Sequence, residues 1–197
     1  VGHDAVGGSL TPVQELLHGG VRAGLPRAPG GRARSSDALT LVRFAHCNEM
    51  LAGTPVVDHF AWFRSCGYSG VEVAPFTVSP VVVDVSGDMR RALRDAAREA
   101  GMAVTGLHWL LAGPAAAVEG WHLTSPSRAV RSRTVTYLQE LAGFCADLGG
   151  TVLVLGSPKQ RSSVDGLSVA EATANLVDSL AAVMPAVADA GATLCLE

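Results

Sequence analysis

Short apolar segments alternate with longer helical segments from Leu41 to the end of the chain. The strand-like segments lie at 41–48, 70–73, 103–109, 151–156 and 193–197. Between the third and fourth of them, apolar residues recur every three or four positions, as one buried helix face requires. Five strands separated by four helices predict a parallel sheet with helices packed against it, because parallel neighbours need a crossover connection.

Capping residues place several helix ends. Ser86 precedes a helical segment that stops at Gly101, and Ser125-Pro126 is expected to begin the next helix. Ser168 and Glu171 form a capping-box pattern before the last helix. Pro185 lies inside that helix and is expected to kink it or start a fresh turn, because proline removes one backbone hydrogen bond.

Two α/β architectures fit this order. An open doubly wound sheet usually has a glycine-rich turn after its first strand, and here that position reads CNEMLAGTP. The alternative is an eight-stranded (β/α)₈ TIM barrel, which takes about 250 residues. We therefore predict an incomplete barrel of five strands and four helices over 41–197, truncated at its C-terminal side. Residues 1–40 are rich in Gly, Pro, Arg and Ser and are expected to form a flexible, disordered leader.

Composition excludes several classes of partner. The net charge is −3, so no basic surface favours nucleic acid. No apolar run reaches the roughly 18 residues of a membrane span, and the N-terminus lacks a signal-peptide pattern. The four cysteines are scattered singly, without a CxxC pair. These features indicate a cytoplasmic protein with reduced cysteines and no membrane or nucleic-acid partner.

Polar side chains stand at the carboxyl ends of the predicted strands, where α/β proteins bind ligands. They are Asn48, Glu49, Glu72, His108, Lys159, Arg161 and Glu197. Each also has a structural interpretation. Glu72 would serve in an ion pair, His108 would bond a loop backbone, and Asn48 would cap a turn. Lys159 and Arg161 would belong to a solvated loop, although two cations beside a Gly-Ser-Pro turn also suit a sugar hydroxyl or a phosphate.

Five segments together resemble one enzyme family. CNEM, CGYSGVEVAPFTV, GLHWLL, the stretch from LTSPSR to SPKQR, and GATLCLE are similar, in order and spacing, to sugar phosphate isomerases/epimerases. These enzymes are xylose isomerase-like TIM barrels that include D-tagatose 3-epimerase-like and hydroxypyruvate isomerase-like members. The resemblance covers roughly 42–197, which would be the N-terminal part only.

The resemblance implies a reaction and a cofactor. It implies a sugar or sugar phosphate isomerase or epimerase that moves a proton through an enediolate. It further implies one divalent metal ion (Mn, Mg or Co) held by Glu, Asp, His and Glu. Glu197 corresponds to the first of these ligands and would also act as catalytic acid/base. The other ligands would lie in a missing C-terminal half, so this chain alone would be inactive.

The resemblance also implies roles in substrate binding. His108 corresponds to a histidine that bonds a substrate oxygen, and Glu72, Asn48, Lys159 and Arg161 are expected to contact substrate. The full-length protein is expected to form a homo-oligomer. An endonuclease IV-like member of the same fold is an alternative, but its histidine-rich zinc array is not visible in the sequence. A second alternative is a non-catalytic α/β binding module, in which Glu197 merely ends a strand.

Overall fold

A single parallel sheet organises the protein. The computed structural model describes residues 42–156, 158–164 and 166–197, so the predicted leader at 1–40 lies outside the described residues. The sheet has the order β1-β2-β3-β4-β5, with every neighbouring pair parallel. Its strands are β1 (Ala45–Cys47), β2 (Gly70–Val73), β3 (Ala103–Leu107), β4 (Val152–Leu155) and β5 (Thr193–Leu196). The prediction of five parallel strands is confirmed, although β1 is shorter than the predicted segment at 41–48.

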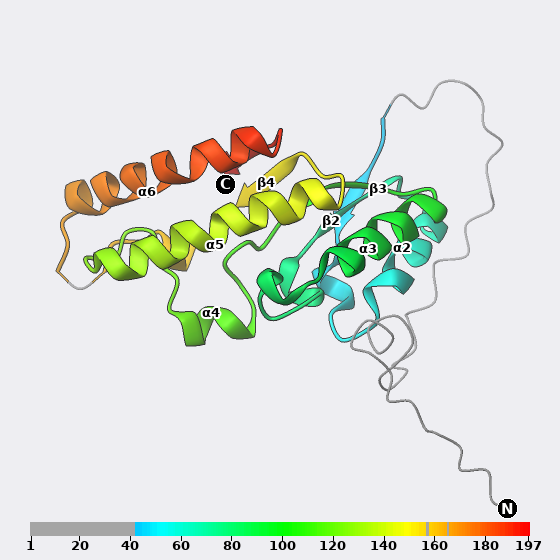
Figure 1. The fold of residues 1–197 in the computed structure, drawn as a ribbon, viewed down its shortest axis with the longest axis horizontal. Coiled ribbons are helices and arrows are strands. Elements are labelled where there is room, and N and C mark those ends of the chain that lie inside the picture. The colour runs from blue at the N-terminus through cyan, green and yellow to red at the C-terminus, as the bar shows by residue number, and fades with distance from the viewer. Residues whose placement is uncertain (1–41, 157, 165) are drawn as a thin grey trace, which may run out of the picture.

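The long helices follow the strands in chain order along the sheet (Figure 1). They are α2 (Val56–Ser65), α3 (Gly87–Glu99), α5 (Arg128–Asp147) and α6 (Val169–Asp189). Contacts join α2 to α3, α3 to α5, and α5 to α6, as in one arc of the outer ring of a barrel. The sequence did not predict the short α4 (Pro114–Glu119). None of the helices in the described ranges combines the length and apolarity that crossing a membrane would require.

The hydrophobic core lies between the helices and one face of the sheet. Val71, Leu107 and Leu153 point to that face and are almost completely buried. Because side chains alternate along a strand, their neighbours point to the opposite face. On that face Val154 is only partly buried and Cys195 is exposed. The helices therefore cover one side of the sheet, and the other side is the one that a closed barrel would turn inward.

Most of the predicted helix ends are confirmed. Ser86 caps α3, and Ser168 and Glu171 form a complete capping box at α6. Helix α5 differs, because its N-cap is Ser127 rather than Ser125. Ser125 instead accepts a hydrogen bond from the Ser127 N–H and is nearly buried. Pro185 lies within α6, which continues unbroken from Val169 to Asp189.

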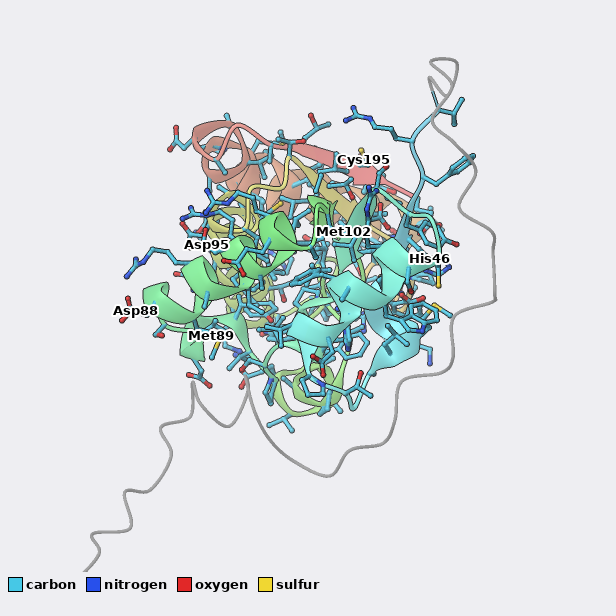
Figure 2. All side chains as sticks on the ribbon, turned by 90° about the vertical axis from the view of Figure 1, so that its right-hand side faces the viewer. His46, Asp88, Met89, Asp95, Met102 and Cys195 are labelled. Carbon is cyan, nitrogen blue, oxygen red and sulfur yellow. The ribbon has the colours of Figure 1, made fainter. Side chains whose placement is uncertain are left out.

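Helix α3 has one side turned to solvent and one side buried against the core. Asp88 extends from its outer side toward solvent, whereas Met89 is buried against the core (Figure 2). Arg90 spans toward α5, where its guanidinium donates to the Asp147 carboxylate at 2.9 Å. This contact joins α3 to the C-terminal end of α5.

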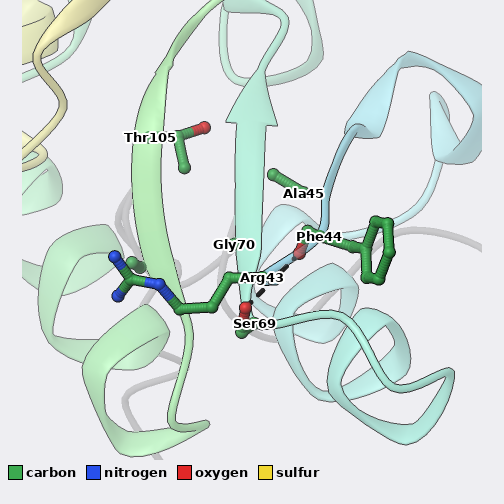
Figure 3. Close-up of a pocket in the computed structure, with 7 residues that line it drawn as sticks. Arg43, Phe44, Ala45, Ser69, Gly70 and Thr105 are labelled. Atoms are coloured by element: carbon green, nitrogen blue, oxygen red, sulfur yellow. Dashed lines mark hydrogen bonds between the residues drawn. The ribbon is translucent and has the colours of Figure 1, made fainter. Parts of the chain in front are cut away.

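A hollow of about 340 Å³ lies at the amino ends of β1, β2 and β3 (Figure 3). It exists because the side chains above it are small, namely Ala45, Gly70 and Ala103. Arg43 supplies the one titratable group among its lining residues. Among its lining residues the hollow therefore has no carboxylate or imidazole group.

Strands β3 and β4 approach unusually closely at Gly106. A Cβ atom built at Gly106 would lie 2.0 Å from the Val152 carbonyl oxygen, closer than any two such atoms can approach. Gly106 pairs with Glu72 on one side and with Val152 on the other. The missing side chain at this position is what lets β4 pair with β3 in this register.

Gly106→Ala is expected to destabilise the fold by about 2–3 kcal/mol, because β3 and β4 must separate to admit the methyl group. Denaturant unfolding would measure the change. Gly143→Ala is the matched control, since it lies inside α5 and the new Cβ would have no atom within 4 Å beyond its chain neighbours and the backbone of its own helix. That control should stabilise the protein by about 0.5–1 kcal/mol through helix propensity. Equal effects of the two substitutions would contradict this account of the strand pairing.

Candidate functional site

His108 stands between two carboxylates at the carboxyl ends of the strands. Its Nδ1 lies 3.4 Å from Glu72 Oε2, and its Nε2 lies 3.5 Å from Glu197 Oε2. The His108 and Glu72 side chains are mostly buried, whereas the Glu197 side chain is 65% exposed. One imidazole ring thus connects an inner carboxylate to an outer one.

The parallel ladders bring these three residues together. The His108 backbone N–H donates to the Val73 carbonyl at 3.1 Å, which extends the β2–β3 pairing by one step. Gly106 pairs with Glu72, and His108 follows two positions later on the same face. At the far side, the Glu197 N–H donates to the Leu155 carbonyl at 3.4 Å. The position of each of these three side chains therefore follows from the way its strand pairs with the neighbouring strand.

A cavity of about 190 Å³ opens beside the outer part of this cluster. It is lined by His108, Trp109, Gly156, Pro158 and Glu197. Trp109 has the left-handed backbone angle φ = 58°, which is uncommon for a residue with a large side chain. Its indole remains 45% exposed, next to the His108 ring. Strain of this kind gathers at binding sites, where the surrounding structure enforces it.

Gly156 makes room for the Glu197 carboxylate. A Cβ atom at Gly156 would lie 2.2 Å from Glu197 Oε2 and 3.6 Å from His108 Nε2. Any larger residue would push the carboxylate away from the histidine. The end of β4 is thus shaped to admit the acidic group that ends the neighbouring strand.

The two predicted cations occupy different positions around the cavity. Arg161 is partly buried, and its guanidinium donates to the backbone carbonyl of Glu197. Lys159 is exposed on the 3₁₀ turn Pro158–Gln160 and is not among the lining residues. The Leu123 N–H donates to the Gln160 carbonyl at 2.7 Å and so fixes this turn to the segment before α5. Arg161 is therefore next to the candidate site, whereas Lys159 is exposed beside the lining residue Pro158 and does not contact the cavity.

Asn48 is fully buried away from the cavity, in a network of side-chain hydrogen bonds. Its Oδ1 accepts from the Ala74 N–H at 2.7 Å. Its Nδ2 donates to Thr77 Oγ1 at 2.9 Å and contacts His59 Nδ1 at 3.2 Å. The amide thus joins the ends of β1 and β2 to α2. The structure places Asn48 where it holds these loops, which corresponds to the turn-capping interpretation.

The direction of these bonds fixes the protonation of His59. Thr54 Oγ1 donates to the Leu51 carbonyl, so it accepts the proton of His59 Nε2, 2.7 Å away. Nδ1 is then free to accept from Asn48. Burial lowers the pKa of His59 to about 4, since the charged ring would lose its hydration. The neutral imidazole is the form that completes the network.

Cys47 joins the cluster from β1, and no motif in the sequence predicted this position. Its sulfur, a Glu72 oxygen and a His108 nitrogen all lie within 4.8 Å of one another. Burial raises the pKa of the Cys47 thiol far above its usual value, and the Glu49 and Glu72 carboxylates raise it further. The signal that could have identified Cys47 is its position at the end of the first strand, because the same edge of the sheet also holds Glu72 and His108.

His46 shows why Cys47 faces the site. The His46 ring packs on the helix side of the sheet, stacked against Phe63 with 5.8 Å between ring centroids. Its Nδ1 contacts the Cys47 carbonyl oxygen at 2.8 Å. Because neighbours in a strand face opposite ways, the Cys47 thiol is directed toward Glu72, its partner in the β1–β2 ladder.

The profile of the xylose isomerase-like TIM barrel family matches residues 60–197. A comparison with curated protein sequences gives no match.

Several solved structures share the fold. A D-psicose 3-epimerase determined in the presence of D-fructose has a TM-score of 0.62 and 17% identity, covering 79% of this chain and 52% of its own. A D-psicose 3-epimerase from Clostridium cellulolyticum H10, determined with D-tagatose, has a TM-score of 0.59 and 19% identity over 74% and 47% of the two chains. An L-ribulose 3-epimerase has a TM-score of 0.60 and 20% identity over 79% and 49%. The present chain thus spans about half the length of these proteins.

The His59 network predicts that stability depends on pH. The pKa of His59 falls from 6.5 to about 4 on folding, so its contribution is complete above pH 6.5 and is lost as pH falls toward 4. The free energy of unfolding should decrease by about 2 kcal/mol more between pH 7 and pH 5 than in a His59→Gln variant. Urea titrations at both pH values measure this difference. Parallel pH dependences in the two proteins would contradict the buried neutral histidine.

Proposed function

The chain belongs to the xylose isomerase-like TIM barrel family, and from this premise we propose that it contributes half of the active site of a metal-dependent sugar isomerase or epimerase. The observation that supports this proposal is the position of His108. It lies between Glu72 and Glu197 at the mouth of a cavity on the strand edge where barrel enzymes bind substrate.

The reaction begins at the carbon next to a sugar carbonyl. Its proton is only weakly acidic, so a base must be held against it while the enediolate charge is stabilised. Glu197 is that base, because its carboxylate is exposed and directed into the cavity. After the proton has moved to a Glu197 oxygen, the same carboxylic acid can return it to the neighbouring carbon while the hydroxyl proton passes to the former carbonyl oxygen. A second acid on the opposite face would turn this isomerisation into an epimerisation.

His108 orients the substrate oxygen. The Nδ1 side of the ring faces Glu72 Oε2 at 3.4 Å, which leaves Nε2 facing the cavity and Glu197. A hydroxyl or carbonyl oxygen of the sugar that enters the cavity beside Nε2 is held at the carboxylate that removes the proton. Glu72 is thus a positioning residue, since it acts on the substrate through His108.

The residues around Glu197 are compatible with the metal ion of this family. The Glu197 carboxylate faces the cavity and is an oxygen donor of the kind that Mn and Mg prefer. Glu197 would hold the ion together with ligands beyond the described residues. The bound ion would polarise the sugar carbonyl and neutralise developing negative charge.

The cavity walls suit a small sugar. Trp109 and Pro158 present apolar surface that can cover the C–H groups of a sugar and exclude water. Arg161, bonded to the Glu197 backbone, would meet a more polar end of the ligand, such as a hydroxyl or a phosphate, and Lys159 would contribute from the neighbouring exposed turn.

Deuterium exchange tests this proposal. A polypeptide that continues past Glu197 with the remaining strands of the barrel is incubated with D-fructose or D-tagatose and Mn²⁺ in D₂O. We expect deuterium at C3 for an epimerase, or at C1 for an aldose–ketose isomerase. Exhaustive chelation should reduce the exchange to background. Full exchange without metal would contradict the proposed role of the ion.

Histidine variants of the same polypeptide provide a matched comparison. His108→Ala should lower turnover by about 10²-fold, because a hydrogen bond to the reacting oxygen is lost. His46→Ala removes a histidine from the helix side of the sheet, so turnover per folded molecule should be unchanged. A His108→Ala protein that loses melting temperature but keeps its turnover would show that the histidine is structural.

A further inference from the structure

We propose that Cys47, Glu72 and His108 form a second site, selective for a borderline transition metal such as Zn²⁺, on the inward face of the sheet. This site goes beyond the proposed function, because it lies on β1, β2 and β3 and uses none of the family's metal ligands. Its three donors are a sulfur, an oxygen and a nitrogen that all lie within 4.8 Å of one another.

The spacing of the atoms suits a metal ion better than a hydrogen bond. The 3.4 Å between His108 Nδ1 and Glu72 Oε2 is long for a charge-assisted hydrogen bond. It equals the edge of a tetrahedron around zinc, which is about 3.3–3.5 Å for nitrogen and oxygen ligands. Cys47 then completes one face of that tetrahedron after a side-chain movement of about 1 Å.

Two buried polar atoms support the same location. His108 Nδ1 and Glu49 Oε2 are both buried without a hydrogen-bond partner among the described residues. The Glu49 carboxylate also lies against the Cys47 thiol. Buried polar atoms of this kind are rare and require an explanation such as an ion or an ordered water. The fourth position of the tetrahedron is therefore open to water or to Glu49.

The chemistry of the donors decides which ion binds. A thiolate with an imidazole favours Zn²⁺ or Co²⁺, whereas Mg²⁺ and Mn²⁺ favour oxygen ligands. The ligand histidine also faces a second carboxylate, since its Nε2 lies 3.5 Å from Glu197 Oε2, a separation that must shorten for a hydrogen bond to form. A carboxylate at the second nitrogen is the usual support for a zinc-bound histidine. An ion at Nδ1 would place the ring proton on Nε2, directed toward Glu197 and the cavity.

Cobalt absorption tests the site without any measurement of turnover. The reduced 197-residue chain, freed of metal by chelation, is titrated with Co²⁺. We expect a thiolate-to-cobalt charge-transfer band that saturates at one equivalent and disappears when Zn²⁺ is added. Cys47→Ser should abolish the band. Cys195→Ser, which changes an exposed cysteine on β5, should leave it unchanged.

A second variant keeps the test valid if Cys47→Ser fails to fold. Glu72→Gln should weaken Co²⁺ binding at least tenfold while the band keeps its shape. Cobalt binding without a thiolate band would show an ion at other carboxylates and would overturn the proposal. A band that persists in Cys47→Ser, or the absence of binding, would also overturn it. Since exchange at the sugar carbon does not enter the readout, failure here leaves the proposed function to its own test.

Discussion

The close approach of β3 and β4 at Gly106 is the constraint on which the rest of the structure depends. With no side chain there, the Val152 carbonyl occupies space that any other residue would fill. Gly106 also pairs with Glu72, directly after the point where the β2–β3 register shifts between Val71 and Glu72, so one position belongs to the ladders of three neighbouring strands. From that register, His108 is placed on the same face as Glu72 and one ladder step beyond it. A shift of one residue would turn His108 into the helix-covered core.

The two faces of the sheet differ in role. One face packs into the hydrophobic core, and the other carries the polar side chains of the candidate site. Leu107 and Leu153 pack under the helices and are almost completely buried. On the other face, Cys47, Glu72 and His108 form one connected polar group, and Glu197 extends it to the cavity. Because the described helices cover only the first face, that polar group lies where a completed barrel would enclose it.

Much of this arrangement could be predicted from the sequence. The strand segments and the Ser168–Glu171 capping box rest on local patterns, and the structure confirms them. The meeting of Glu72, His108 and Glu197 follows from parallel topology, since the carboxyl ends of parallel strands share one edge. The matching family profile and the epimerase structures agree with the resemblance seen in the sequence.

Other features depend on contacts between distant segments, which no local pattern reports. The burial of Asn48 arises from Ala74 and Thr77, residues that the β1–β2 pairing brings beside it. Ser127 replaces Ser125 as the cap of α5 because Ser125 is drawn into the buried turn before it. The left-handed backbone of Trp109 likewise results from its surroundings, as tryptophan has no preference for that conformation.

We propose that the carboxyl ends of the strands, and not their amino ends, form the ligand site. Amide chemical shifts of the isotope-labelled chain, followed during titration with D-fructose, test this claim most directly. We expect the amide shifts of His108, Trp109, Gly156 and Glu197 to change together and to saturate. We expect no change around the hollow lined by Phe44, Ser69 and Gly70. Saturable changes at that hollow, with none at His108, would contradict the assignment of the ligand site to the carboxyl ends.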